Sequence, residues 1–343
     1  MTTLLTERRT AYLCQLDYVK LVAAFLVVAL HTHPLYPLDE QSVLFRLLKA
    51  LADIAVPVFF MSSGYMLFSA CRDGDDQERA RYIKAYIKRI ARQYCIWSLI
   101  YLPISVYGYL SGGASIPGMT VSLIRNLLLV GQNFCSWQLW YLCATLWGSL
   151  LLLLLHKLMK KDAVTVLLAL IVFAISCGVD YVQQTQAAQG SVVASLQKII
   201  GVTIAGGRIM LGFVYLSIGK ILASKSKYLS LRIAIPVTVV LFAAAVLTGS
   251  AWLGLIMHIA FFSMVLVMPA GANKERARFA RKLSTCIYFT HMLVVFVAYC
   301  VCGFTFCYGW IMFIATAVIS AAISVLLCLY GKRQPKVFHL LFG

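Results

Sequence analysis

The sequence has 343 residues, of which 62% are hydrophobic and only 12% are charged, and its mean hydropathy is +0.86. A water-exposed surface needs roughly 25% charged residues, so this composition excludes an ordinary soluble fold and predicts a chain that lies in lipid. Its apolar stretches are continuous rather than alternating, which excludes a transmembrane β-barrel and predicts an all-α integral membrane protein.

Ten apolar segments are long enough to be membrane-spanning helices, at about 20 residues for each crossing. Arg8 and Arg9 precede the first segment, and Pro34 follows it where a cleavage site would need a small residue. We therefore expect the first segment to be retained as an anchor, and we expect one transmembrane domain over residues 1–343 with no appended soluble domain. The predicted spans are residues 15–33, 51–70, 93–111, 137–156, 163–181, 202–222, 233–249, 251–270, 283–302 and 305–330.

The basic residues of the chain are distributed unevenly between the predicted loops. There are 30 Lys and Arg residues against 12 Asp and Glu, a net charge of +18. In a soluble protein this excess would suggest nucleic acid, whereas in a membrane protein Lys and Arg gather in cytoplasmic loops. With alternate loops on opposite sides, one side holds all but five of them, and we expect both termini to be cytoplasmic and no nucleic-acid partner. The five are Arg46, Lys49, Arg125, Lys198 and Arg208.

The first two predicted spans carry ionisable residues, which are costly in lipid and therefore functional candidates. His31 lies 14 residues after Asp17, about 21 Å along a helix, in the outer half of the bilayer. Asp53 begins the second span on the same side, and a carboxylate beside an imidazole can orient a general base. Asp53 is either that partner or a solvated charge, and His33 is either a substrate contact or an interfacial residue.

Further polar residues lie at the ends of later spans. Arg89 and Arg92 are three residues apart, so they share a helical face that can bind a phosphate or polarise a carbonyl. Ordinary cytoplasmic flanking of a span also accounts for them and explains most of the basic run from Arg72 to Arg92. His291 follows Tyr288 in the ninth span and is either an acid, base or substrate ligand, or a packing residue. An aromatic belt accounts for Trp137, Trp140 and Tyr141, and the 11 cysteines lack metal-ligand spacing, so no metal site is predicted.

Several of these segments together resemble the acyltransferase-3 family of bacterial membrane enzymes, which O-acylate cell-surface sugars and polymers. Residues 17–31 resemble its opening Asp-x-x-Arg-x-x-Ala and hallmark His, and residues 56–65 are similar to its Val-Pro-x-Phe-Phe-x-x-Ser-Gly-Tyr stretch. Residues 89–92 match its Arg-x-x-Arg, and residues 139–142 and 283–291 resemble its fourth-span and late-span signatures. Two positions depart from the pattern, because Lys20 replaces the first-motif Arg and Thr145 stands where one branch has Glu.

The resemblance implies an O-acyltransferase, with acetyl the expected group, that takes acyl-CoA from the cytoplasmic side. It implies that the acceptor is a hydroxyl of a saccharide, polymer or small molecule and that the protein lies in the bacterial cytoplasmic membrane. His31 would be the general base, supported by Asp17 or Asp53. The implied donor-binding residues are Arg89, Arg92, Lys20 and Lys88, and the implied substrate-binding residues are His33, Trp140, Tyr141, Tyr288 and His291.

An alternative function comes from a narrower resemblance. Residues 29–35 and 54–64 are similar to the membrane domain of the vancomycin-resistance serine racemases, which is associated with L-serine uptake. In a transporter of that kind, arginine would bind the substrate carboxylate and Asp53 its ammonium group. The enzyme and the amino-acid transporter therefore both remain hypotheses at this stage, beside a structural or partner-binding role.

Overall fold

The computed structural model describes residues 12–36, 38–71, 74–159, 161–186, 191–203, 208–225, 228–269 and 273–343. All regular secondary structure in these ranges is helical, which confirms the predicted all-α class. The α-helices are α1 (Cys14–Thr32), α2 (Val43–Asp53), α3 (Ala55–Ala70), α4 (Asp76–Ser111), α5 (Ile116–Arg125), α6 (Trp140–Leu158), α7 (Asp162–Gln184), α8 (Val192–Thr203), α9 (Arg208–Ser224), α10 (Leu231–Thr248), α11 (Ala251–Val267), α12 (Lys274–Val301), α13 (Trp310–Arg333) and α14 (Pro335–Phe342). A π-helical turn, Asn126–Val130, and a 3₁₀ turn, Trp137–Leu139, precede α6.

Each predicted span coincides with a helix, although the boundaries differ. Within the described ranges, six helical segments are long and apolar enough to cross a membrane: α1, α6 with its preceding turn, α7, α10, α12 and α13. The chain is therefore a multi-pass membrane protein. The predicted start of the second span is wrong, because residues 51–53 end α2 and α3 begins at Ala55. Residues 204–207 of the predicted sixth span lie outside the described residues.

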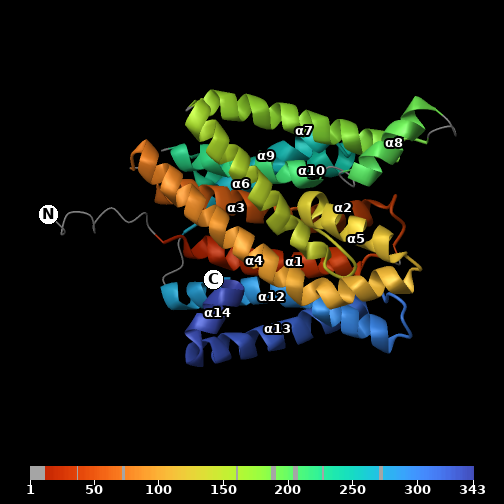
Figure 1. Ribbon diagram of the computed structural model, residues 1–343. Coiled ribbons are helices and arrows are strands. Elements are labelled where there is room, and N and C mark those ends of the chain that lie inside the picture. Colours follow the sequence, from red (N-terminus) through yellow and green to blue (C-terminus); the bar gives the residue numbers. More distant parts are fainter. Residues whose placement is uncertain are drawn as a thin grey trace.

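Four shorter helices were not predicted, and they lie at the ends of the bundle. In Figure 1, α2, α5 and α8 gather at its right-hand end, whereas α14 lies towards the left. Each has 8 to 12 residues, too few to cross a bilayer, and none is a long continuous apolar run. The side chain of Ser42 caps α2 by accepting a hydrogen bond from the Phe45 amide at 3.1 Å.

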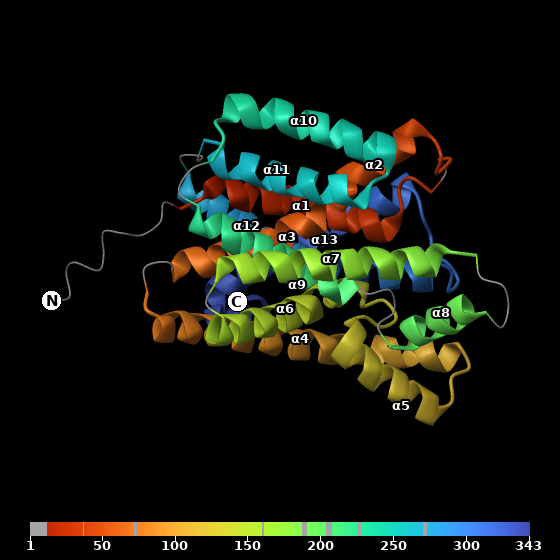
Figure 2. The ribbon, with the colours of Figure 1, turned by 90° about the horizontal axis from the view of Figure 1, so that it is seen from above.

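The long helices run side by side, with α7 and α13 at opposite edges in Figure 1 and α10 and α4 at opposite edges in Figure 2. In the interior, α3 and α9 are in close backbone contact through Gly64 and Gly219. A Cβ at Gly64 would overlap the carbonyl of Leu216, and one at Gly219 would overlap the backbone of Met61. Small residues permit this close approach where lipid supplies no hydrophobic force between helices.

Basic side chains gather at the end of the bundle where α4 and α12 begin, which we call the basic end. α1 also begins there, and the Ser284 hydroxyl of α12 donates a 2.9 Å hydrogen bond to the carbonyl of Lys20. This bond places Lys20 and Ser284 at the same level on two neighbouring helices. We call the other end of the bundle the distal end.

Candidate functional site

A cavity with a volume of about 880 Å³ opens among the helices of the basic end. Its walls come from α1, α3, α4, α6, α12 and the C-terminal pair α13 and α14. Packing of helices against each other in lipid does not require a cavity of this size. Ligand sites are commonly found between the helices of a bundle. The cavity is therefore the candidate functional site.

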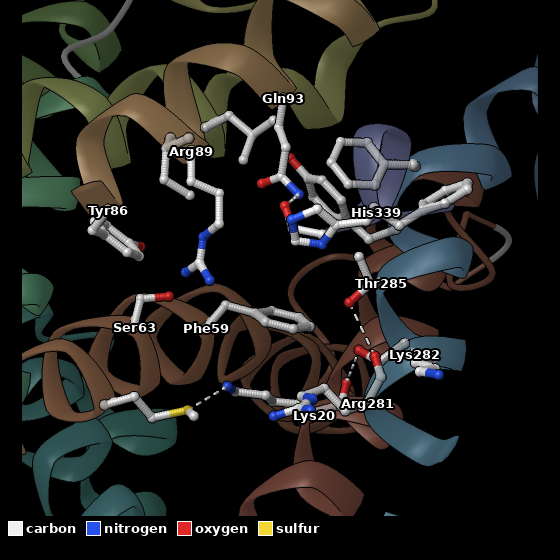
Figure 3. Close-up of a pocket in the computed structure, with 18 of the residues that line it drawn as sticks. Lys20, Phe59, Ser63, Tyr86, Arg89, Gln93, Arg281, Lys282, Thr285 and His339 are labelled. Carbon is white, nitrogen blue, oxygen red and sulfur yellow. Dashed lines mark hydrogen bonds between the residues drawn. The ribbon is translucent and has the colours of Figure 1, made fainter. Parts of the chain in front are cut away.

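Four cationic side chains line this cavity, and the lining residues that the structure describes include no Asp or Glu. They are Lys20 of α1, Arg89 of α4, and Arg281 and Lys282 of α12. In Figure 3, Arg89 reaches down from α4 towards Ser63 and Phe59, while Lys20 and Arg281 lie on the opposite wall. Four positive charges around a partly enclosed space favour an anionic ligand.

Lys20 and Arg89 each contact an uncharged side chain, a methionine and a tyrosine respectively. The Lys20 ammonium lies 3.4 Å from the Met66 sulfur, and the Arg89 guanidinium lies over the Tyr86 ring at 5.1 Å from its centroid. Among the ion pairs of the described residues, none includes Lys20 or Arg89. A cation that no carboxylate neutralises is available to an anionic ligand.

The C-terminal helix α14 forms part of the cavity wall. Phe338, His339 and Phe342 line the cavity from this helix. Gln93 donates a 2.9 Å hydrogen bond to the carbonyl of Gly343, and the Trp97 indole donates one of 2.8 Å to the carbonyl of Leu341. The end of α14 is therefore attached to α4 by side chains that satisfy its last carbonyl groups.

The inner end of the cavity is polar and leads towards the distal end. Tyr141 and Tyr288 line it, with ring centroids 5.8 Å apart. The Tyr141 hydroxyl lies 2.9 Å from the Ser63 hydroxyl, and Tyr288 donates a 2.6 Å hydrogen bond to the carbonyl of Gln138. Since Tyr288 is one helical turn before His291, this polar end approaches the histidines of the interior.

His31 and His291 come together from α1 and α12. Their rings stack with centroids 5.4 Å apart and an interplanar angle of 25°, and Trp137 lies 6.0 Å from His31. His291 is fully buried, and its Nδ1 lies 2.9 Å from the carbonyl of Ile287. A carbonyl only accepts, so Nδ1 carries the proton and Nε2 of the neutral ring is an acceptor; it has no hydrogen-bond partner among the described residues.

The carboxylates predicted to support His31 are engaged elsewhere. Asp53 forms an exposed 2.5 Å ion pair with Lys49 on α2. Asp17 is buried at the basic end, about 21 Å from His31 along α1, where it accepts a hydrogen bond from the Tyr12 hydroxyl. Burial, together with this bond, raises the pKa of Tyr12 to about 12. The rings of His291 and Trp137, rather than either carboxylate, neighbour His31.

The predicted ligand-binding residues divide into two groups. Lys20, Arg89, Tyr141 and Tyr288 line the cavity, and His291 lies one turn beyond it. The others lie outside the lining. A guanidinium nitrogen of Arg92 lies 3.3 Å from the carbonyl oxygen of Gly343, and Lys88 is exposed. The Trp140 ring packs on Phe60, with ring centroids 5.8 Å apart. His33 is exposed, and its ring centroid lies 5.1 Å from that of Tyr308.

Sequence reasoning missed several contributors to the site, among them Gln93, Trp97 and the residues of α14. Gln93 and Trp97 are polar or amphipathic side chains on a predicted span, and their spacing from Arg89 at i+4 and i+8 indicates the same helical face. The residues of α14 carried no signal of this kind, because an eight-residue segment shows too little periodicity to predict what it contacts.

Comparison with known proteins adds the following similarities. An acyltransferase domain matches residues 15–331. An amino-acid racemase of Enterococcus faecalis is 34% identical over 136 residues, which are 39% of this chain and 17% of that protein. A serine/alanine racemase of Enterococcus gallinarum is 34% identical over 149 residues, which are 43% of this chain and 20% of that protein. The matched regions thus span about a fifth of these relatives or less, and no solved structure matches the chain.

Proposed function

The chain belongs to the acyltransferase-3 family, and from this membership we propose that it is a membrane-bound O-acyltransferase of the bacterial cytoplasmic membrane. It transfers an acyl group, in this proposal acetyl, from acyl-CoA to a hydroxyl of a cell-surface saccharide, polymer or small molecule. The observation that carries the proposal is the cavity of about 880 Å³ that four cations line and whose inner end includes Tyr288, one helical turn before His291.

The donor lies in this cavity with its phosphates among Lys20, Arg89, Arg281 and Lys282. The excess of Lys and Arg at this end supports a cytoplasmic location for the cavity mouth, where CoA is available. Along α1, Lys20 and His31 are 11 residues apart, or about 16 Å. The extended arm of CoA, which carries the thioester at its end, suits a site whose anion-binding and reacting groups are separated in this way.

In the proposed mechanism, His31 takes the proton of the acceptor hydroxyl as its oxygen attacks the thioester carbonyl carbon. The C–O bond forms, the C–S bond breaks, and the proton passes from His31 to the departing CoA thiolate, which gives the ester and free CoA. His291, whose Nε2 is an acceptor, receives a hydrogen bond from a further hydroxyl of the acceptor and orients it. Such positioning and base catalysis are the main contributions available to side chains of this kind.

The test is release of free CoA thiol by the purified protein supplied with acetyl-CoA. The wild-type protein should turn acetyl-CoA over, by transfer or by slow hydrolysis, and His31→Ala should slow the release by about a hundredfold or more. Equal turnover in the variant would remove His31 as the base, and absence of CoA binding by the wild type would contradict the donor assignment.

A second candidate is an amino-acid transporter, to which the partial identity to a serine/alanine racemase gives only a weak link. In that case the cavity would hold a zwitterion, with Arg89 at its carboxylate. The structure offers little for the ammonium group, because the described lining residues of the cavity include no carboxylate and Asp53 pairs with Lys49. Proteoliposomes that accumulate labelled serine without CoA would favour transport over acyl transfer.

A further inference from the structure

A second, smaller cavity lies at the basic end, on the other side of the α3 and α4 pair. Its volume is about 110 Å³, and it lies among α3, α4, α6, α7 and α9. Its basic lining residues are Arg79, His156, Lys161 and Lys220, and Asp162 is the one carboxylate among its described lining residues. The proposed acyl transfer uses none of these side chains.

The lining of this cavity has more positive than negative charge. Lys220 lies 2.9 Å from Asp162, and the His156 ring lies 3.9 Å from the carboxylate of Asp76, which is half exposed beside the lining. Lys161 is exposed at the rim. The lining residues include three Lys and Arg side chains and one carboxylate, so the cavity favours an anion.

The start of α7 adds to this preference. Lys161 is the N-cap residue of this 23-residue helix, and its side chain makes no capping hydrogen bond. The N-terminus of a helix carries partial positive charge on amide groups that lack partners within the helix. The basic side chains and the helix N-terminus therefore act on the same small volume.

The size of the cavity limits the ligand. A volume of about 110 Å³ corresponds to a few water molecules, each of which occupies about 30 Å³ in the liquid. One phosphate group fits this space, whereas an entire nucleotide or CoA does not.

The neighbouring surface indicates the source of the phosphate. Leu158 and Met159 follow His156 at the end of α6 and are 68% and 51% exposed. Exposed apolar side chains beside a basic pocket, at the end of helices that span a membrane, match a lipid whose chains lie on the helices and whose head group lies in the pocket.

We propose that this second cavity binds the phosphate group of an anionic phospholipid in the leaflet at the basic end. The lipid links α4, α6, α7 and α9 at their ends. The interaction is independent of the acyl-transfer site.

The test uses the full chain in detergent, with phosphatidylglycerol or phosphatidylcholine added at equal concentration and bound lipid counted by native mass spectrometry. Phosphatidylglycerol should be retained preferentially. Lys161→Glu should lower its retention by roughly fivefold or more, since a basic residue near a lipid surface contributes about that factor. Lys157→Glu is the matched control, because Lys157 is exposed at the same end but does not line the cavity.

Equal retention by Lys161→Glu and wild type would overturn the proposal, and an equal loss in Lys157→Glu would reduce the effect to general charge. Both lysines are exposed, so neither change should prevent folding. Millimolar inorganic phosphate provides the remaining arm. Binding of phosphate would be measured as a gain in thermal stability that depends on Lys161. If phosphate binds in this way while phosphatidylglycerol is retained no better than phosphatidylcholine, the site takes soluble phosphate and the lipid assignment is overturned.

Discussion

His31 and His291 stack with ring centroids 5.4 Å apart, although 260 positions separate them in the sequence. The pair joins α1 to α12 one turn beyond the inner end of the cavity. Two titratable rings at this position give the interior a proton-accepting group from each of two helices, and both can approach the same ligand.

The first prediction concerns His31 as general base. His31→Ala should lower the rate of CoA release from acetyl-CoA by about 10²- to 10⁴-fold, the usual contribution of a positioned acid or base. His258→Gln is the control, because His258 is a partly buried histidine whose Nδ1 lies 3.0 Å from the Tyr215 hydroxyl and which does not line the cavity. A loss of similar size in the control would show that loss of an interior histidine impairs folding rather than chemistry.

The second prediction concerns the coupling of the two histidines. If both act on one acceptor, the double variant His31→Ala with His291→Ala should lose little more activity than His31→Ala alone, since residues that act as a unit are strongly non-additive. The rates of the two single variants and the double variant measure this directly. Losses that multiply would mean that His291 acts independently of His31.

The third prediction separates Arg89 from Arg92. Arg89 lines the cavity, so Arg89→Gln should raise the KM for acetyl-CoA by about two- to fivefold, an effect that falls at high salt. Arg92→Gln should leave this KM unchanged and lower stability by about 1 kcal/mol, because Arg92 contacts the Gly343 carbonyl of α14. Steady-state kinetics and thermal unfolding distinguish them. An equal rise in KM for both would place both in the donor site.

The fourth prediction concerns the contact of α3 with α9. Gly219→Ala should destabilise the protein by about 1 to 3 kcal/mol, the usual cost of overpacking, because the new methyl group would overlap the backbone of Met61. Gly254→Ala is the matched control, since its methyl group would meet nothing within 4 Å. Its stability should be unchanged or slightly higher. Thermal unfolding in one detergent compares the two, and equal midpoints would contradict the close contact.

The long helices were predictable because a continuous apolar run of about 20 residues is typical of a spanning helix and of few soluble elements. The predicted segment 163–181, for example, lies within α7, which the structure extends to Asp162–Gln184. The short helices were not predictable for the converse reason. The residues of α2 that precede the second predicted span, such as Arg46 and Lys49, interrupt its apolar pattern, and the position of Asp53 depends on the i+4 pair with Lys49.

The site was predictable in part. His31 and His291 were predicted as site residues because an ionisable side chain inside a membrane is energetically costly. The structure brings these two together. Their contact itself depends on α1 packing beside α12, which a single sequence does not encode as a local pattern. The pair Arg89 and Arg92 shows the limit of periodicity, because three residues correspond to about 300° of helical rotation. That difference of about 60° directs Arg89 to the cavity and Arg92 to α14.

The wall of the cavity unites Lys20, near the beginning of the chain, with His339 and Phe342, near its end. During synthesis, α1 therefore enters the membrane first, and the wall is complete only after residues 335–343 have left the ribosome. A product that stops after α13 would retain every apolar span but lack this part of the wall. Insertion of the apolar helices into the membrane and completion of the cavity wall are thus separate events in the biogenesis of this protein.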